Sequence, residues 1–197
     1  MDERDLDRDP LRQFERWFAE ARDAGLPAPE AMTLATATTD GRPSARMVLL
    51  KVADERGFGF HTNYESRKGV ELAENPYAAL LFHWRPLGRQ VRVEGRVERV
   101  SAEESEAYFQ TRPHASRIAA WASPQSRPLA DRAELERLYE EAAARFPGDE
   151  VALPPHWGGF RLVPDAYEFW QHGEDRLHDR VRYTLQGNGW TRERLAP

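Results

Sequence analysis

A strand-to-helix junction in the first half of the chain carries side chains that could bind a phosphate group. Thr62 ends a predicted strand, and Ser66, Arg67 and Lys68 open the helix that follows. Free backbone N–H groups at a helix start, a hydroxyl and two cations are groups that hold phosphates in proteins. Taken alone, these residues are explained more simply as an ordinary helix cap with solvated charges.

A second pair of cations, Arg46 and Lys51, flanks the apolar run Met47–Leu50 of one predicted strand. Successive side chains of a strand point to opposite faces, so this odd spacing would place the two cations on opposite sides of the sheet. Both could contact one phosphate only through a bulge or a strand-end geometry.

Tyr108, Arg112 and Ser116 form a third set. Tyr108 and Arg112 are four residues apart and share a helix face, and the Ser116 hydroxyl lies just beyond. This set could bind a second phosphate, and an amphipathic surface turn is the alternative.

The segment from Arg176 to Arg180 is the fourth set. If it is extended, Arg176, His178 and Arg180 point to one face. Two arginines beside a histidine repel one another unless an anion or a carboxylate faces them, and the neighbouring aspartates could serve as such partners. Trp170, shortly before, offers a stacking surface, although a lone tryptophan is more often part of a core.

Other chemistries find no support in the sequence. The chain has no cysteine, which excludes disulfides, thiolate metal sites and cysteine nucleophiles. We find no nucleophile elbow, Walker loop, metalloprotease helix or glycine-rich dinucleotide fingerprint. The six histidines show no metal-ligand spacing on a predicted helix, so we expect no metal site.

Composition indicates a globular protein. The 197 residues are 40% hydrophobic and 31% charged, with a net charge of −5 that argues mildly against a nucleic-acid partner. The longest apolar run, Tyr77–Phe82, is far shorter than the roughly 20 residues of a membrane span. The acidic N-terminus does not resemble a signal peptide, so we expect a cytoplasmic protein without membrane contact.

The elements that must position these residues are mostly strands. Helices are expected over residues 10–24, 66–74, from 101 to Arg112, and over 131–146; strands are expected over residues 32–38, 44–52, 57–62, 77–84, 90–100, 158–163, 167–171, 180–185 and 190–195. Most strand connections read as hairpins. The fold class is therefore α+β, mainly β: an antiparallel barrel with peripheral helices.

Taken in order, these segments resemble the pyridoxamine/pyridoxine 5′-phosphate oxidases, which are FMN enzymes. The matching stretches are Arg46-Met-Val-Leu-Leu-Lys51, Thr62-Asn-Tyr-Glu-Ser-Arg-Lys-Gly69, Gly88-Arg-Gln-Val-Arg92, Tyr108-Phe-Gln-Thr-Arg-Pro113, Ala120-Trp-Ala-Ser-Pro-Gln-Ser126, Trp157-Gly-Gly159, Glu168-Phe-Trp-Gln171, Arg176-Leu-His-Asp-Arg180 and Arg194-Leu-Ala-Pro197. The likeness runs from about Asp9 to the last residue, and the tail and the Gln-Ser segment are its specific parts.

The resemblance implies a homodimeric FMN-binding split barrel with two flavin sites at the subunit interface. It implies that FMN is bound by Arg46, Lys51, Thr62, Arg67, Lys68, Gln90, Gln125, Ser126, Trp170 and Arg180. It implies that the phosphate of a B6 vitamer substrate is bound by Lys51, Tyr108, Arg112 and Ser116, with Arg176 and His178 as catalytic residues against the pyridine ring. We expect one domain over residues 1–197, a flexible terminus over residues 1–8, and a dimerisation and active-site segment over about residues 150–197.

The implied reaction is hydride transfer from the substrate C4′ carbon to the flavin, which O2 reoxidises to give hydrogen peroxide. Three departures from the family pattern stand out. No N-terminal Arg…Tyr lid is present, His61 replaces an aromatic residue such as tyrosine, and His172 replaces a glycine. Two alternatives stay open: a related FMN oxidase of a reduced ring such as a dihydrophenazine, and a flavin-binding split-barrel protein without turnover.

Overall fold

The strands form one curled antiparallel sheet. The computed structural model describes residues 1–197, and its nine strands follow the order β2-β1-β5-β6-β7-β4-β3, with β8 paired to β7 and β9 to β8. The strands are β1 (Ala31–Ala37), β2 (Pro43–Leu49), β3 (Val52–Asp54), β4 (Gly57–Asn63), β5 (Tyr77–Trp84), β6 (Arg89–Arg99), β7 (Trp157–Gln171), β8 (Asp179–Gln186) and β9 (Gly189–Arg194). All pairings are antiparallel, which confirms the predicted mainly-β class.

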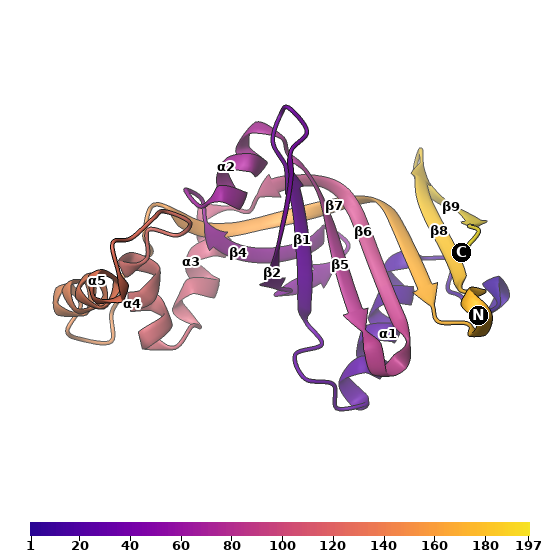
Figure 1. The fold of residues 1–197 in the computed structure, drawn as a ribbon, viewed down its shortest axis with the longest axis horizontal. Helices are drawn as coiled ribbons and strands as arrows, with labels where there is room; N and C mark the ends of the chain where they lie inside the picture. The colour runs from indigo at the N-terminus through magenta and orange to yellow at the C-terminus, as the bar shows by residue number, and fades with distance from the viewer.

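Five α-helices lie around this sheet. They are α1 (Pro10–Asp23), α2 (Arg67–Glu74), α3 (Ala102–Gln110), α4 (His114–Ala122) and α5 (Arg132–Arg145). Helices α3, α4 and α5 gather at one end of the molecule, and β8, β9 and both chain termini lie at the other end (Figure 1). No helix is long and apolar enough to cross a membrane.

Helix α1 supplies the aromatic centre of the core. Asp9 caps its first turn by accepting a hydrogen bond from the Leu11 N–H group, and Pro10 fits the first helical position. On its inner face the Phe14 ring lies 4.9 Å from both Phe58 and Phe82, centroid to centroid. The predicted helix is confirmed, and its inner face packs on rings from β4 and β5.

Strand β7 corrects a prediction. The sequence predicted two strands, over residues 158–163 and 167–171, but the structure has one strand that continues through Pro164. The pairing with β6 shifts register after Glu94, so Gly95 lies opposite Pro164. A side chain at Gly95 would lie 2.0 Å from the Val163 carbonyl oxygen. This bulge therefore tolerates a proline, which lacks a backbone donor, inside a long strand.

Helix α4 was not predicted. The Arg112-Pro113 pair does end α3, as expected, but Pro113 also serves as the N-cap of α4. Proline has a fixed backbone angle that suits a helix start, so it separates two helices here instead of leading into a loop. Ser116 therefore lies in the first turn of a helix.

Residues 1–8 have defined contacts. Leu6 is buried in the main core, and the Tyr183 hydroxyl donates a hydrogen bond to the Asp7 carbonyl at 2.7 Å. The N-terminal ammonium group contacts the carboxylate of Asp179, at the start of β8. The flexibility expected for this segment stays a prediction, and these contacts show what any movement would have to break.

Replacing Phe14 by alanine is expected to lower the free energy of unfolding by about 3–5 kcal/mol, because a fully buried ring is lost from the core. Urea unfolding at one protein concentration measures this. The matched control is Glu15→Ala, an exposed position of the same helix, which should change the value by no more than about 0.5 kcal/mol. Equal losses in the two variants would contradict the packing described for α1.

Candidate active site

Eight of the candidate site residues named from the sequence line one cavity of about 520 Å³. We call it the first cavity. The eight residues are Arg46, Lys51, Thr62, Lys68, Tyr108, Arg112, Ser116 and Gln125. Elements distant in the sequence, from β2 to the loop after α4, contribute to its wall. The two sets that could each bind a phosphate therefore share one space.

Arg46 and Lys51 reach this cavity together because the strand ends between them. Strand β2 stops at Leu49, Leu50 is buried, and the Lys51 N–H group donates to the Gly59 carbonyl at 2.8 Å as the chain turns toward β3. The strict alternation of a strand no longer applies beyond that point. The odd spacing of Arg46 and Lys51 required a strand-end geometry to bring both cations to one site. The structure has that geometry, since β2 ends at Leu49 and both residues line the first cavity.

Lys68 is buried at the start of α2 among neutral hydrogen-bond acceptors. Its ammonium group donates to Gln125 Oε1 at 2.7 Å and to Thr62 Oγ1 at 3.1 Å. Burial, and then the nearby charge of Arg46, lower the pKa of Lys68 to about 8. A cation with no carboxylate partner at the wall of a cavity is well placed to meet an anion.

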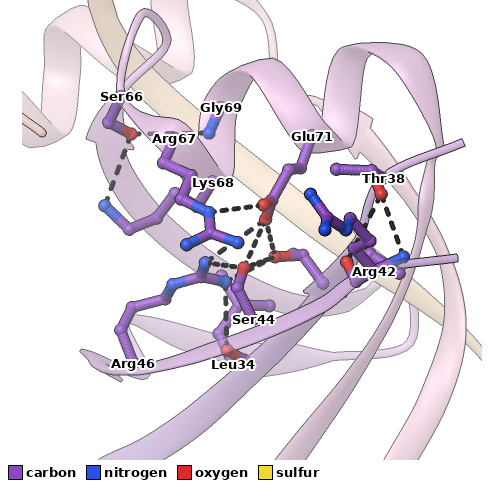
Figure 2. Close-up of polar contacts among 12 residues, drawn as sticks. Leu34, Thr38, Arg42, Ser44, Arg46, Ser66, Arg67, Lys68, Gly69 and Glu71 are labelled. Atoms are coloured by element: carbon purple, nitrogen blue, oxygen red, sulfur yellow. Dashed lines mark hydrogen bonds and ion pairs between the residues drawn. The ribbon is translucent and has the colours of Figure 1, made fainter. Parts of the chain in front are cut away.

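Glu71 is a buried carboxylate that the sequence interpretation missed. Figure 2 shows the side chains of Arg46 and Arg67 converging on it from β2 and from its own helix. It also accepts hydrogen bonds from the hydroxyls of Ser44 and Thr36. Burial alone would raise the pKa of Glu71, but these hydrogen bonds outweigh it and lower the pKa to about 2. Glu71 therefore stays charged and fixes the direction of Arg46.

A signal for Glu71 was present in the sequence. Arg67 and Glu71 are four residues apart in α2, a spacing that brings two side chains together on a helix. Glu71 also precedes the buried Leu72 on the side of the helix that faces the sheet. A charged residue on an inward face is rarely buried without partners.

Three stacked rings form the other wall of the cavity. The ring of His61 lies 4.0 Å from that of Tyr108 and 5.3 Å from that of Trp157. The Arg112 guanidinium carbon lies 4.6 Å from the centre of the Trp157 ring. The sequence indicates Trp157 only as part of the motif Trp157-Gly-Gly159. In the structure its ring packs against the guanidinium group of Arg112.

Arg112 indicates that this wall fits a phosphate. Its Nη1 atom is buried and has no hydrogen-bond partner, and burial lowers the pKa of Arg112. A buried guanidinium nitrogen without a partner is costly unless a ligand supplies the acceptor. The oxygens of a phosphate group are such acceptors, so the residues present fit the phosphorylated molecules that the resemblance implies.

Gln90, Trp170 and Arg180 lie elsewhere. They line a second cavity of about 230 Å³ together with Glu168, which accepts a hydrogen bond from Arg180 Nε at 2.8 Å. The His178 ring lies 4.6 Å from the Trp170 ring, and its Nδ1 atom accepts a hydrogen bond from the Gly173 N–H group at 3.2 Å.

The segment before His178 corrects another expectation. Residues 174–176 form a 3₁₀ turn rather than extended chain, with φ of 63° at Arg176. Strand β8 begins only at Asp179, because its pairing with β7 starts there. Arg176 therefore does not share a strand face with His178 and Arg180. Arg67 and Ser126 also line neither cavity, although Arg67 contacts Glu71 and Ser126 directly follows Gln125.

Strand β7 separates the two cavities. Thr62 pairs with Gly158 near the start of β7, and Gln90 pairs with Trp170 near its end. The thirteen residues from Gly158 to Trp170 correspond to about 40 Å measured along the extended chain. Within one chain, the two groups of predicted site residues therefore line two different cavities.

Two family profiles match the chain. The family described as "Pyridoxamine 5'-phosphate oxidase" matches residues 18–146. The one described as "Pyridoxine 5'-phosphate oxidase C-terminal dimerisation region" matches residues 157–197, which include the whole of β7, β8 and β9.

Relatives and solved structures agree with the profiles. Proteins named pyridoxine/pyridoxamine 5′-phosphate oxidase from Herminiimonas arsenicoxydans and Cupriavidus taiwanensis are 59% and 60% identical over 100% of this chain and 93% of their own length. The crystal structure of PhzG from Burkholderia lata 383, in complex with tetrahydrophenazine-1-carboxylic acid, has a TM-score of 0.92 at 37% identity over 98% of this chain and 95% of that one.

A more distant structure supports the fold alone. A pyridoxamine 5′-phosphate oxidase-related FMN-binding protein from Nostoc punctiforme has a TM-score of 0.76 at 18% identity, over 98% of this chain and 100% of that one. With a profile match over more than half of its residues and relatives of about 60% identity along its whole length, the chain belongs to the pyridoxamine 5′-phosphate oxidase family.

Proposed function

We propose that this protein is an FMN-dependent oxidase that converts pyridoxine 5′-phosphate and pyridoxamine 5′-phosphate to pyridoxal 5′-phosphate. The observation that carries this proposal is the first cavity, in which two phosphate-binding sets meet. Oxidation of the alcohol passes two electrons and two protons to O2 and yields hydrogen peroxide. Oxidation of the amine also consumes one water and releases ammonia.

The first cavity divides between the two phosphates. We assign the FMN phosphate and the chain next to it to Arg46, Lys51, Thr62, Arg67, Lys68, Gln125 and Ser126. We assign the substrate phosphate to Lys51, Tyr108, Arg112 and Ser116. The buried Arg112 nitrogen without a partner supports this division, since the FMN side of the cavity already has Lys68 and Arg46. Ser116 in the first turn of α4 adds a hydroxyl beside the free backbone N–H groups of a helix start.

The site residues near the end of β7, which we call the second group, complete the site from another subunit. Gln90, Trp170, Arg176, His178 and Arg180 lie at the far end of β7, about 40 Å of strand away. A homodimer related by a two-fold axis can place this end of one subunit against the first cavity of the other, and it then forms two equal sites. The match of residues 157–197 to a dimerisation region supports this arrangement.

Held by Arg46, Lys68 and Gln125, FMN would supply the acceptor for a hydride from the substrate carbon and the route for its electrons to O2. The protein positions the substrate. Because the Gly173 N–H group donates to His178 Nδ1, the neutral ring carries its proton on Nε2, which is left as a donor. We propose that Arg176 and the Nε2–H group of His178 orient the pyridine ring as hydrogen-bond donors, while Trp170 excludes water. The proton that leaves the alcohol or amine is released to solvent and balances the peroxide formed from O2.

Aerobic incubation of the FMN-loaded protein with pyridoxine 5′-phosphate is expected to give pyridoxal 5′-phosphate and hydrogen peroxide in equal amounts. Absorbance of the aldehyde and a coupled peroxide assay measure the two products together. Unphosphorylated pyridoxine is the matched control, and its kcat/KM should be lower by about 30-fold or more, because the contacts to the charged phosphate are lost. Turnover of a reduced phenazine carboxylic acid without turnover of B6 phosphates would replace this proposal by the PhzG-like alternative.

Co-expression of two inactive variants tests the shared site. Arg112→Ala removes a residue of the first cavity, and His178→Ala removes a residue of the second group. Each variant alone should have almost no activity at substrate concentrations below KM. Random mixing gives half mixed dimers, each with one intact site, and should restore about a quarter of native activity. Arg112→Ala with Ser116→Ala, both from the first cavity, should restore nothing. A mixed dimer of the first pair without activity would place the whole site within one subunit.

The affinity for FMN is expected to fall as the pH rises from 7 to 9. The pKa of Lys68 is lowered to about 8 in the free protein, so above that pH the protein must take up a proton to offer a cation to the phosphate. The Kd should rise by up to about tenfold per pH unit above 8. Quenching of FMN fluorescence measures it. Lys68→Arg, which stays charged, should remove this dependence; an unchanged pH profile in that variant would assign the effect to another group.

A further inference from the structure

His61 is a half-buried titratable side chain that the proposed chemistry does not use. Its ring lies on β4 and stacks on Tyr108 and near Trp157 at the wall of the first cavity. Both ring nitrogens are shielded from solvent and have no hydrogen-bond partner. Buried polar atoms without a partner are uncommon in folded proteins, so this one needs an explanation.

The charges around His61 keep it neutral. Burial first, and then the positive charges of Lys51 and Arg112, lower the pKa of His61 to about 4. Glu104 acts in the opposite direction but is paired with Arg161 at 2.8 Å and Arg56 at 3.1 Å. Four segments contribute the groups that face the ring. Lys51 comes from the link between β2 and β3, and Arg112 comes from the segment after α3. Glu104 and Tyr108 come from α3, and Trp157 and the Gly159 backbone come from β7.

The stack leaves little freedom to the imidazole. A side chain at Gly159 would lie 2.9 Å from His61 Nε2, so the backbone of β7 lies directly against the ring. Tyr108 covers one side of the ring at a nearly parallel angle of 21°. The imidazole therefore responds to a change in the cavity by a change of charge rather than by moving away.

A phosphate dianion bound by Lys51, Tyr108, Arg112 and Ser116 reverses the local field. Its two negative charges compensate the two cations that oppose protonation of the ring, and they favour the imidazolium form directly. We propose that His61 takes up a proton when the substrate phosphate enters, and that the imidazolium then acts as a positioning residue whose positive charge attracts the anion at the Tyr108 side of the cavity. This inference rests on the substrate side of the cavity as assigned in the proposed function.

Sulfate binding to the FMN-loaded protein tests the inference. Inorganic sulfate is the probe because it keeps both negative charges over the whole pH range used, whereas a phosphate changes its own charge. Calorimetry at pH 5.5 in two buffers with different heats of ionisation measures the protons taken up. We expect about half a proton or more per site, and a Kd for sulfate that tightens by up to about tenfold per pH unit as the pH falls from 7 to 5.

His61→Phe keeps an aromatic ring in the stack and removes the titratable nitrogens, so it should bind sulfate with a Kd that changes less than about twofold over the same range. His61→Tyr is a second variant of this kind. His178 and Lys68 stay in place in both, so the difference from the native protein isolates His61. His114→Gln is the control, because its ring bonds to the Gly148 carbonyl outside the cavity and its loss should leave the proton uptake unchanged.

Equal proton uptake in the native protein and in both His61 variants would overturn the proposal, as would failure of the native protein to bind sulfate. A protein that binds sulfate with His61-dependent proton uptake but does not oxidise B6 phosphates would refute the proposed function instead. The two failures are therefore distinguishable.

Discussion

Strand β7 is the constraint on which the rest of the arrangement depends. It pairs with β6 along nearly its whole length, and its other edge pairs with β4 in the first half and β8 in the second. The first cavity lies beside β4, and the rings of Trp170 and His178 lie near the start of β8, so β7 connects the two groups of side chains. In the proposed function, these two groups form one site when two chains associate.

The first cavity carries more positive charge than the protein balances. Arg46, Lys51, Lys68 and Arg112 line it, and Glu71 is the buried carboxylate beside them. Burial, and then the nearby charge of Arg46, lower the pKa of Lys68, and one buried nitrogen of Arg112 has no hydrogen-bond partner. Both point to a site built for anions that arrive from solution.

Local rules predicted much of the fold and the residue types of the site. The cap at Asp9, the alternation in β6 and the cap at Ser101 each act over a few residues, and the structure confirms them. Tertiary pairing decided the rest. Strand β7 continues through Pro164 because Gly95 allows a bulge opposite it, and the burial of Glu71 depends on strands more than twenty residues away. The turn at Arg176 likewise depends on where β8 begins to pair.

The unbalanced cations of the first cavity also connect the lifetime of the polypeptide to its cofactor supply. Four cations beside the one buried carboxylate of Glu71 repel one another, so the folded chain carries a penalty that a bound anion removes. A ligand that binds only the folded state shifts the folding equilibrium by an amount that grows with the logarithm of its concentration. By this linkage, we expect newly made chains in a cell short of FMN to spend more time unfolded and accessible to proteases. We therefore expect the abundance of the enzyme to follow the availability of the flavin.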